Sequence, residues 1–329
     1  MSELHKFIFD GLPVRGQLVL LTDAWQELLA RRASDLERGG YPAPVIEVLG
    51  QMTAAAVLMQ GSIQFDGALV LQIQGDGPLR LAVAEVQADL RLRATATLAG
   101  PVAPGLDLRA LVNAQGQGRC AITLDPRERR PGQHAYQGVV PLVDAAGQPL
   151  DRVSAMLEHY MRQSEQLDTT LVLAASAQAA AGLMLQRLPV QGQHNLAQGA
   201  LAQPGDGGEQ GEDDFARLSL LARSLRAEEL LELDADTLLR RLFWDERLLR
   251  LDSLQDERAP RFACSCSRTR MAAMLTGLGR HEVEAVLDER GEVEVGCDFC
   301  GRQERFDAVD VARLFTPAEQ RVPQPPIVQ

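Results

Sequence analysis

Four of the five cysteines fall within 37 residues and form two close pairs, Cys264-Ser265-Cys266 and Cys297-Asp298-Phe299-Cys300. Two thiolates that are close in sequence can hold one zinc ion from a single turn, and zinc favours four tetrahedral ligands. The residues between the pairs carry helical patterns at 268–278 and 282–287 and a strand pattern at 292–295, which predict a folded insert. The sequence therefore predicts one Zn²⁺ per chain, with Cys264, Cys266, Cys297 and Cys300 as its ligands.

The spacing leaves two kinds of zinc site open, a purely structural site and a redox switch. Only one residue separates Cys264 from Cys266, whereas most structural sites use gaps of about two to four residues. Metal-bound sulfur is thiolate, which is the form that oxidants attack. Oxidation would remove an apparent binding free energy of roughly 10–16 kcal/mol. That is comparable with the roughly 5–15 kcal/mol that stabilises a whole domain, so the zinc region would unfold.

The remaining candidate residues carry no enzyme signature. Cys120 lies in an alternating stretch at 118–123, which predicts a buried, inert thiol. The chain has a single lysine, Lys6, and it contains no phosphate-binding loop, dinucleotide-binding loop or nucleophile elbow. The histidines show no spacing of a metal site: His5, His134, His159, His194 and His281. We therefore expect a protein that is not an enzyme and has no catalytic residues.

The charge balance excludes some classes of partner. The chain carries 33 basic and 45 acidic residues, a formal net charge of −12, and residues 261–306 hold seven arginines against eight acidic residues. A nucleic-acid interface needs clustered basic residues, so no nucleic-acid partner is expected. The uncharged stretches 48–65 and 169–186 contain glutamine, serine or glycine and favour buried elements over membrane spans. Without a secretory pattern at the start, we expect a cytoplasmic protein with no membrane partner.

The order of helix and strand patterns predicts an α+β fold with a mainly antiparallel sheet. Thr22 is the expected N-cap of a first helix, and a second helix is expected at 45–59. Strands are expected at 62–66, 68–74, 79–84, 90–95, 119–124, 136–143, 170–174 and 182–188, with a helix at 149–166. The expected segments are an α+β core at 1–190, a flexible Gly/Gln/acidic tract at 191–214, a leucine-rich helical linker at 215–258, a zinc domain at 259–316 and a disordered tail at 317–329.

The leucine-rich linker has two interpretations. Residues 215–251 show apolar positions at helical spacing, with arginine and glutamate between them. The apolar positions lie on two faces, Phe215, Leu218, Leu221 and Leu225 on one and Leu238, Leu239, Leu242 and Phe243 on the other. The segment is either a helical hairpin that packs on its own domain or an amphipathic segment that docks reversibly.

The sequence resembles the heat shock protein 33 family, the redox-regulated holdase chaperones of bacteria, over nearly its whole length. The two cysteine pairs at this separation are the most specific part of the likeness. The motifs that carry it are 61–67 (GSIQFDG), 71–79 (LQIQGDGPL), 136–140 (YQGVV), 164–166 (SEQ), 181–186 (AGLMLQ), 264–268 (CSCSR) and 297–301 (CDFCG).

The resemblance implies an ATP-independent chaperone that is latent when reduced and zinc-bound. It implies disulfides Cys264–Cys266 and Cys297–Cys300 on oxidation, with release of zinc. The linker, which the resemblance places in the leucine-rich region, then unfolds and exposes a surface for unfolded client proteins. The active form is a homodimer, formed through the 1–190 core.

Two functions of other classes compete with a chaperone. A zinc-ribbon regulator or adaptor should carry a basic face, which this chain lacks. A thiol-disulfide oxidoreductase that uses Cys297 and Cys300 would place them at a helix start inside a βαβ unit, whereas here they follow a strand pattern.

Overall fold

The chain divides into two compact units, Met1–Ala263 and Cys264–Gln329, in the computed structural model. The structure describes residues 1–35, 39–128, 132, 134–144, 146–189, 209–254 and 258–316. The expected tail at 317–329 lies outside the described residues, and so do residues 190–208 of the expected flexible tract.

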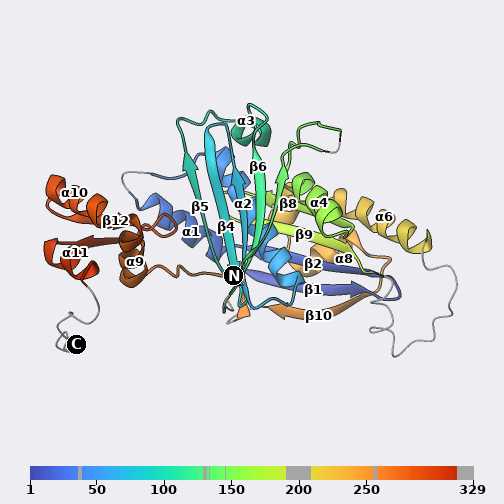
Figure 1. The fold of residues 1–329 in the computed structure, drawn as a ribbon. Helices are drawn as coiled ribbons and strands as arrows, with labels where there is room; N and C mark the ends of the chain where they lie inside the picture. Colours follow the sequence, from blue (N-terminus) through green and yellow to red (C-terminus); the bar gives the residue numbers. More distant parts are fainter. Residues whose placement is uncertain are drawn as a thin grey trace. The chain divides into compact units, whose positions relative to one another are not determined.

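The first unit contains a five-stranded sheet in the order β10-β1-β2-β9-β8, and every neighbouring pair in it is antiparallel (Figure 1). Its strands are β1 (Glu3–Phe9), β2 (Val14–Leu21), β8 (Thr169–Ala175), β9 (Ala180–Arg187) and β10 (Leu248–Leu254). In the centre of this sheet Val19 faces Gly182 across β2 and β9. The stretch 169–186 is thus a buried hairpin of β8 and β9, as the sequence predicts.

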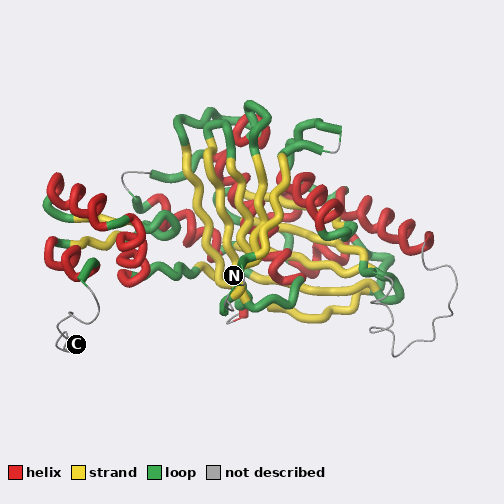
Figure 2. Tube along the Cα trace, viewed as in Figure 1, coloured by secondary structure: helices red, strands yellow, loops and turns green. Residues whose placement is uncertain are grey.

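A six-stranded sheet in the same unit has the order β11-β5-β4-β3-β6-β7. Its strands are β3 (Gly67–Gln74), β4 (Leu79–Gln87), β5 (Arg91–Leu98), β6 (Arg119–Pro126), β7 (Tyr136–Pro141) and β11 (Arg261–Phe262). Among the described strands of this sheet, only the β11–β5 pair is parallel. Figure 2 shows the strands of the unit, in yellow, running side by side. The predicted α+β class with mainly antiparallel sheets is confirmed.

Helix α2 (Ala43–Ser62) forms the centre of the first unit's core and contacts strands of both sheets. Pro42 precedes it in extended backbone, and fourteen of its twenty residues are buried. A Cβ at Gly50 would come within 2.5 Å of the Ala175 side chain, so glycine is needed for this close packing. By length and composition α2 alone among the described helices could cross a membrane, but 78% of that apolar window is buried inside the protein.

The first unit contains further helices besides α2. They are α1 (Asp23–Ala33), α3 (Leu108–Val112), α4 (Val153–Ser164), α6 (Glu209–Arg223), α7 (Ala227–Glu232) and α8 (Ala235–Leu242). Because α6 begins at Glu209, the last residues of the expected flexible tract are helical.

The leucine-rich segment packs on the five-stranded sheet as part of the first unit. Its helices bury Leu218, Leu230, Leu238, Leu239 and Phe243 against strand residues that include Phe7, Phe9, Leu183 and Leu185. The expectation of helix as far as residue 251 is wrong, since Leu248–Leu254 form β10, which pairs with β1. The edge of β1 leaves backbone N–H and C=O groups that this segment satisfies, and such pairing overrides helical spacing.

Two local predictions in the first unit are wrong. Residues 62–66 form no strand, because α2 continues to Ser62 and β3 begins at Gly67. Thr22 stands at the N-cap of α1 but its side chain makes no capping bond. The Ser2 hydroxyl takes that role from the start of the chain, since it accepts from the backbone N–H of Thr22 at 3.1 Å and of Ala24 at 3.3 Å.

The second unit is small and contains helices around one hairpin. Its elements are α9 (Arg268–Leu278), α10 (Arg280–Arg290), β12 (Val293–Gly296), β13 (Gln303–Phe306) and α11 (Ala308–Leu314). The predicted folded insert between the cysteine pairs is therefore present. The core consists of seven buried residues, Met271, Leu275, Val283, Val293, Val295, Phe306 and Val311.

Candidate metal centre

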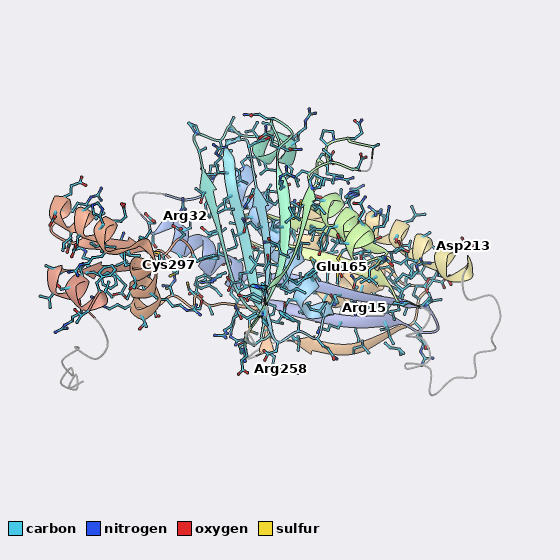
Figure 3. The ribbon with its side chains drawn as sticks, in the orientation of Figure 1. Arg15, Arg32, Glu165, Asp213, Arg258 and Cys297 are labelled. Atoms are coloured by element: carbon cyan, nitrogen blue, oxygen red, sulfur yellow. The ribbon has the colours of Figure 1, made fainter. Side chains whose placement is uncertain are left out.

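Each cysteine pair of the second unit is positioned by local backbone structure, one pair before a helix and the other on a tight turn. Cys264 and Cys266 precede α9, whose N-cap Ser267 accepts from the Arg270 N–H at 3.2 Å. Cys297 and Cys300 lie on the turn between β12 and β13 (Figure 3 labels Cys297). The Cys297 N–H donates to the Arg302 carbonyl at 2.9 Å, and the Gly301 N–H donates to the Cys297 carbonyl at 2.9 Å. Gly301 has φ +69°, a left-handed conformation that favours glycine.

The structure brings all four predicted ligands together. Their sulfur atoms lie within 4.8 Å of one another. The Cys264 and Cys297 sulfurs are 3.6 Å apart, and those of Cys266 and Cys300 are 3.3 Å apart. A tetrahedral zinc ion with Zn–S bonds of about 2.3 Å places its sulfurs about 3.8 Å apart. The four thiols, all half-buried, are therefore close enough to bind one metal ion, and the donor set is one that zinc favours.

The cluster stabilises thiolate at one position. The pKa of Cys264 is lowered to about 4, because the Cys297 thiol donates to its sulfur and the Cys266 backbone N–H adds a second donor. The pKa of Cys297 is raised because its thiol is that donor. Burial, together with contacts to Cys300 and Cys264, raises the pKa of Cys266 to about 11. The negative charge of the Cys264 thiolate thus favours the protonated form of the neighbouring thiols. A metal cation that binds the four sulfurs would take the place of those protons.

Arg268 connects the first cysteine pair to the rest of the second unit. Its guanidinium lies 4.3 Å from the centroid of the Phe306 ring and donates to the Arg305 carbonyl at 2.7 Å. It also pairs with Asp310 at 2.6 Å and Glu304 at 3.2 Å. These contacts fix the start of α9 against β13 and α11. No local pattern predicts a role for Arg268, because its partners lie 36 to 42 residues further along the chain and only folding brings them near.

Cys120 takes no part in the cluster. It is fully buried on β6 in the first unit, opposite Ile73 on β3 and Val140 on β7. Burial raises the pKa of its thiol to about 12, which fits the predicted inert cysteine. Within the described part of the chain, the four-cysteine cluster is the one group of three or more His, Cys, Asp or Glu side chains close enough to hold a metal ion. His194 lies outside the described residues.

Known proteins are similar to this chain over most of its length. The family model described as Hsp33 protein matches residues 2–307. The 33 kDa chaperonin of Chromobacterium violaceum is 44% identical over 314 residues, which cover 95% of this chain and 94% of that protein. The 33 kDa chaperonin of Shewanella woodyi is 36% identical over 315 residues, 96% of each chain.

A solved structure also shares the fold. The 33 kDa chaperonin from Thermotoga maritima, a heat shock protein 33 homologue, matches with a TM-score of 0.70 over 95% of this chain and 97% of that chain, at 20% identity. The expected class, a chaperone rather than an enzyme, agrees with the family and with the names of these relatives. With a family model over residues 2–307 and full-length relatives above 30% identity, the chain belongs to the Hsp33 family.

Proposed function

We propose that this protein is a redox-regulated, ATP-independent holdase that binds unfolding proteins under oxidative stress. It is latent when reduced and zinc-bound, and disulfide formation with zinc release activates it. The observation that carries the proposal is the gathering of four sulfurs within 4.8 Å in a small unit of their own. Membership of a chaperone family supports the holdase activity.

In the latent state, Cys264, Cys266, Cys297 and Cys300 would hold one Zn²⁺ as thiolates. An ion bound there would cross-link the start of α9 to the β12–β13 turn and would favour the thiolate form of the four sulfurs. Each thiolate pair gives two electrons to one molecule of hydrogen peroxide, which takes up two protons from water and is reduced to two water molecules while one S–S bond forms in the pair, so the two pairs consume two peroxide molecules. The resulting disulfides are Cys264–Cys266 and Cys297–Cys300. A disulfide sulfur is no longer a thiolate ligand, so the four residues would no longer hold the ion.

Loss of the ion should unfold the second unit. Among its described residues only seven apolar side chains are buried in its core, and a core of this size supplies little stability without a metal. The chain enters this unit directly from β11, which ends one residue before Ala263. Unfolding beyond Cys264 would leave the two-residue pairing of β11 with β5 as the last attachment of the segment that leads back to β10 and the leucine-rich helices.

The leucine-rich segment is the proposed gate over the client-binding surface. Its buried leucines cover one face of the five-stranded sheet, where Phe7, Phe9, Leu183 and Leu185 lie. Helix α8 has eight residues and α7 has six, and helices this short are marginal in water without a partner. Release of the segment would expose a continuous apolar surface, which is the kind of surface that unfolded proteins bind.

The remaining parts of the proposal concern partners and compartment. The partners are unfolded client proteins, and the active form is a homodimer formed through the core. The net charge of −12 disfavours a nucleic-acid partner. Burial of most of the apolar window of α2 disfavours a membrane span. A zinc cluster that must stay reduced until stress fits the cytoplasm, where thiols are kept reduced.

Suppression of aggregation tests the function directly. A chemically unfolded protein is diluted into buffer that contains the reduced, zinc-loaded chain or the peroxide-oxidised chain, without nucleotide. We expect suppression by the oxidised form only, and the same behaviour from the matched control Cys120→Ser. Equal activity of both forms would leave a constitutive chaperone with a structural zinc site. Activity in neither form, with disulfide exchange on a model dithiol, would favour the oxidoreductase.

A further inference from the structure

The first unit contains a cavity of about 90 Å³ that the proposed redox mechanism does not use. Its walls are mainly apolar and include Met59, Ile63, Leu69, Leu124, Met161 and Leu167. Four of the sequence motifs that lie outside the cysteine cluster each supply a residue to it, and these residues are Ser62, Tyr136, Glu165 and Gln186. Segments far apart in the sequence thus meet at one cavity, which carries both polar and apolar groups.

Arg15 supplies a positive charge to this cavity. Its Nε and Nη2 donate to the Gln186 side-chain oxygen at 3.0 and 2.6 Å, and its Nη1 donates to the Ser62 carbonyl at 3.1 Å. Within the described residues it has no carboxylate at ion-pair distance. Two of its five N–H groups remain for another acceptor. The C-terminal end of α2, which includes Ser62, compensates only part of the charge, about half an elementary charge.

Glu165 supplies a negative charge at the exposed mouth of the same cavity. Its Oε1 accepts from the Tyr160 hydroxyl at 2.9 Å and from the Tyr136 hydroxyl at 3.5 Å. Both tyrosines are neutral donors, and burial and the contact with Glu165 raise the pKa of Tyr160. Among the described side chains, no cation pairs with Glu165. Figure 3 labels Arg15 and Glu165, which come from β2 and from the end of α4.

The backbone conformation at two nearby residues, Gln166 and Gly138, helps to place the Glu165 side chain beside Tyr160. Gln166 has φ +54°, one of two non-glycine residues of the described chain in the left-handed region, and such a residue carries strain that the surroundings must offset. A Cβ at Gly138 would come within 2.7 Å of the Tyr160 ring and hydroxyl. Glycine at 138 therefore lets Tyr160 reach Glu165.

We propose that this cavity binds a small zwitterion of amino-acid size, with its carboxylate on Arg15, its ammonium on Glu165 and an apolar side chain against the walls. The two opposite charges line one apolar cavity and are each held by neutral groups, so a ligand with both charges satisfies both. The cavity of about 90 Å³ is several times larger than the roughly 10–15 Å³ that one water molecule needs, so it has room for a small ligand. Valine is the probe of this class that carries both charges and a short apolar side chain.

A binding titration of the reduced, full-length protein tests the site, followed by NMR or by calorimetry. The probes are L-valine, isovalerate, which lacks the ammonium, and isobutylamine, which lacks the carboxylate. We expect saturable binding of valine and at least about tenfold weaker binding of isobutylamine, because its hydrogen bonds to the charged Arg15 are lost. Isovalerate should also bind more weakly than valine, but by a smaller factor, because the ammonium that it lacks would pair with the exposed Glu165 carboxylate. Arg15→Gln should weaken valine binding at least about tenfold. Glu165→Gln should weaken it less, since its carboxylate is exposed to solvent.

Two further variants keep the test decisive if Arg15→Gln does not fold. Ile63→Trp fills the cavity without changing a charge and should abolish valine binding, while Arg109→Gln removes an exposed arginine elsewhere and should leave it unchanged. Absence of saturable binding to the unmodified chain would overturn the site. Binding that Ile63→Trp leaves intact would overturn the location, and equal binding of isovalerate and valine would overturn the zwitterion class.

Discussion

The Thr170 hydroxyl donates to the Ser219 hydroxyl at 2.8 Å, a buried hydrogen bond that joins β8 of the five-stranded sheet to α6 of the leucine-rich segment. The ion pair of Arg223 with Glu158, at 3.0 Å, joins the same helix to α4. The segment is therefore attached to the sheet by specific polar contacts as well as by apolar packing. Substitutions that weaken this attachment can therefore test the proposed gate without an oxidant.

The double variant Leu238→Ser, Leu239→Ser should act as a chaperone while still reduced. Both leucines are 1% exposed, whereas Leu242, another apolar residue of the predicted stripe, is only half-buried. Each replacement costs roughly 2–5 kcal/mol at a buried site, which should release the segment from the sheet. The measurement is aggregation suppression without peroxide, together with zinc content and protease sensitivity. The matched control is Leu220→Ser, since Leu220 is 71% exposed. If the variant keeps its zinc, resists protease and remains inactive, the gate is wrong and the segment is only a spacer.

Metal analysis of the reduced protein should find about one zinc per chain. Cys266→Ser should lose most of it, because three thiolates remain where four are close enough to bind. Cys120→Ser should keep all of it, because Cys120 is buried in the other unit. Retention of zinc by Cys266→Ser would show that the ion is held elsewhere.

Mass mapping of the peroxide-oxidised protein should find Cys264 linked to Cys266 and Cys297 linked to Cys300. In the folded cluster two close sulfur contacts run between the pairs, Cys264 to Cys297 at 3.6 Å and Cys266 to Cys300 at 3.3 Å. Once oxidation begins to unfold the unit, short loops close more readily than long ones. The experiment thus separates two outcomes, since dominant links between the pairs would mean that the folded geometry decides the connectivity.

Cys120 should resist alkylation in the native protein and react only in denaturant. Burial raises the pKa of its thiol from 9.0 to about 12. A raised native pKa contributes stability below pH 9, and that contribution is lost as the pH rises from 9 towards 12, because the unfolded thiol ionises first. The full difference corresponds to roughly 4 kcal/mol. Denaturant unfolding of Cys120→Ala should therefore show a shallower loss of stability over this range than the parent. Parallel curves would show that the thiol is accessible to solvent.

Local pattern was enough to predict much of the fold and the whole cysteine cluster. The helix expected at 45–59 is α2 (Ala43–Ser62), and the strand expected at 119–124 is β6 (Arg119–Pro126). Periodicity and turn residues are properties of neighbouring positions, so they are visible in one chain read in order. The cysteine pairs are visible for the same reason, because a pair that binds one ion from one turn must be close in sequence.

Only the tertiary structure decided where segments with ambiguous local pattern belong. Leu248–Leu254 has the leucine content of the helices before it, yet it is a strand because β1 offers it an unpaired edge. The roles of Arg268 and Arg15 depend on partners from distant parts of the chain, and Glu165 contacts Tyr136, 29 residues before it, as well as the nearby Tyr160. A sequence determines which groups each residue carries and its local conformational preference. The contacts that give an isolated charge its partner, or place it in a cavity, exist only after distant elements have packed together.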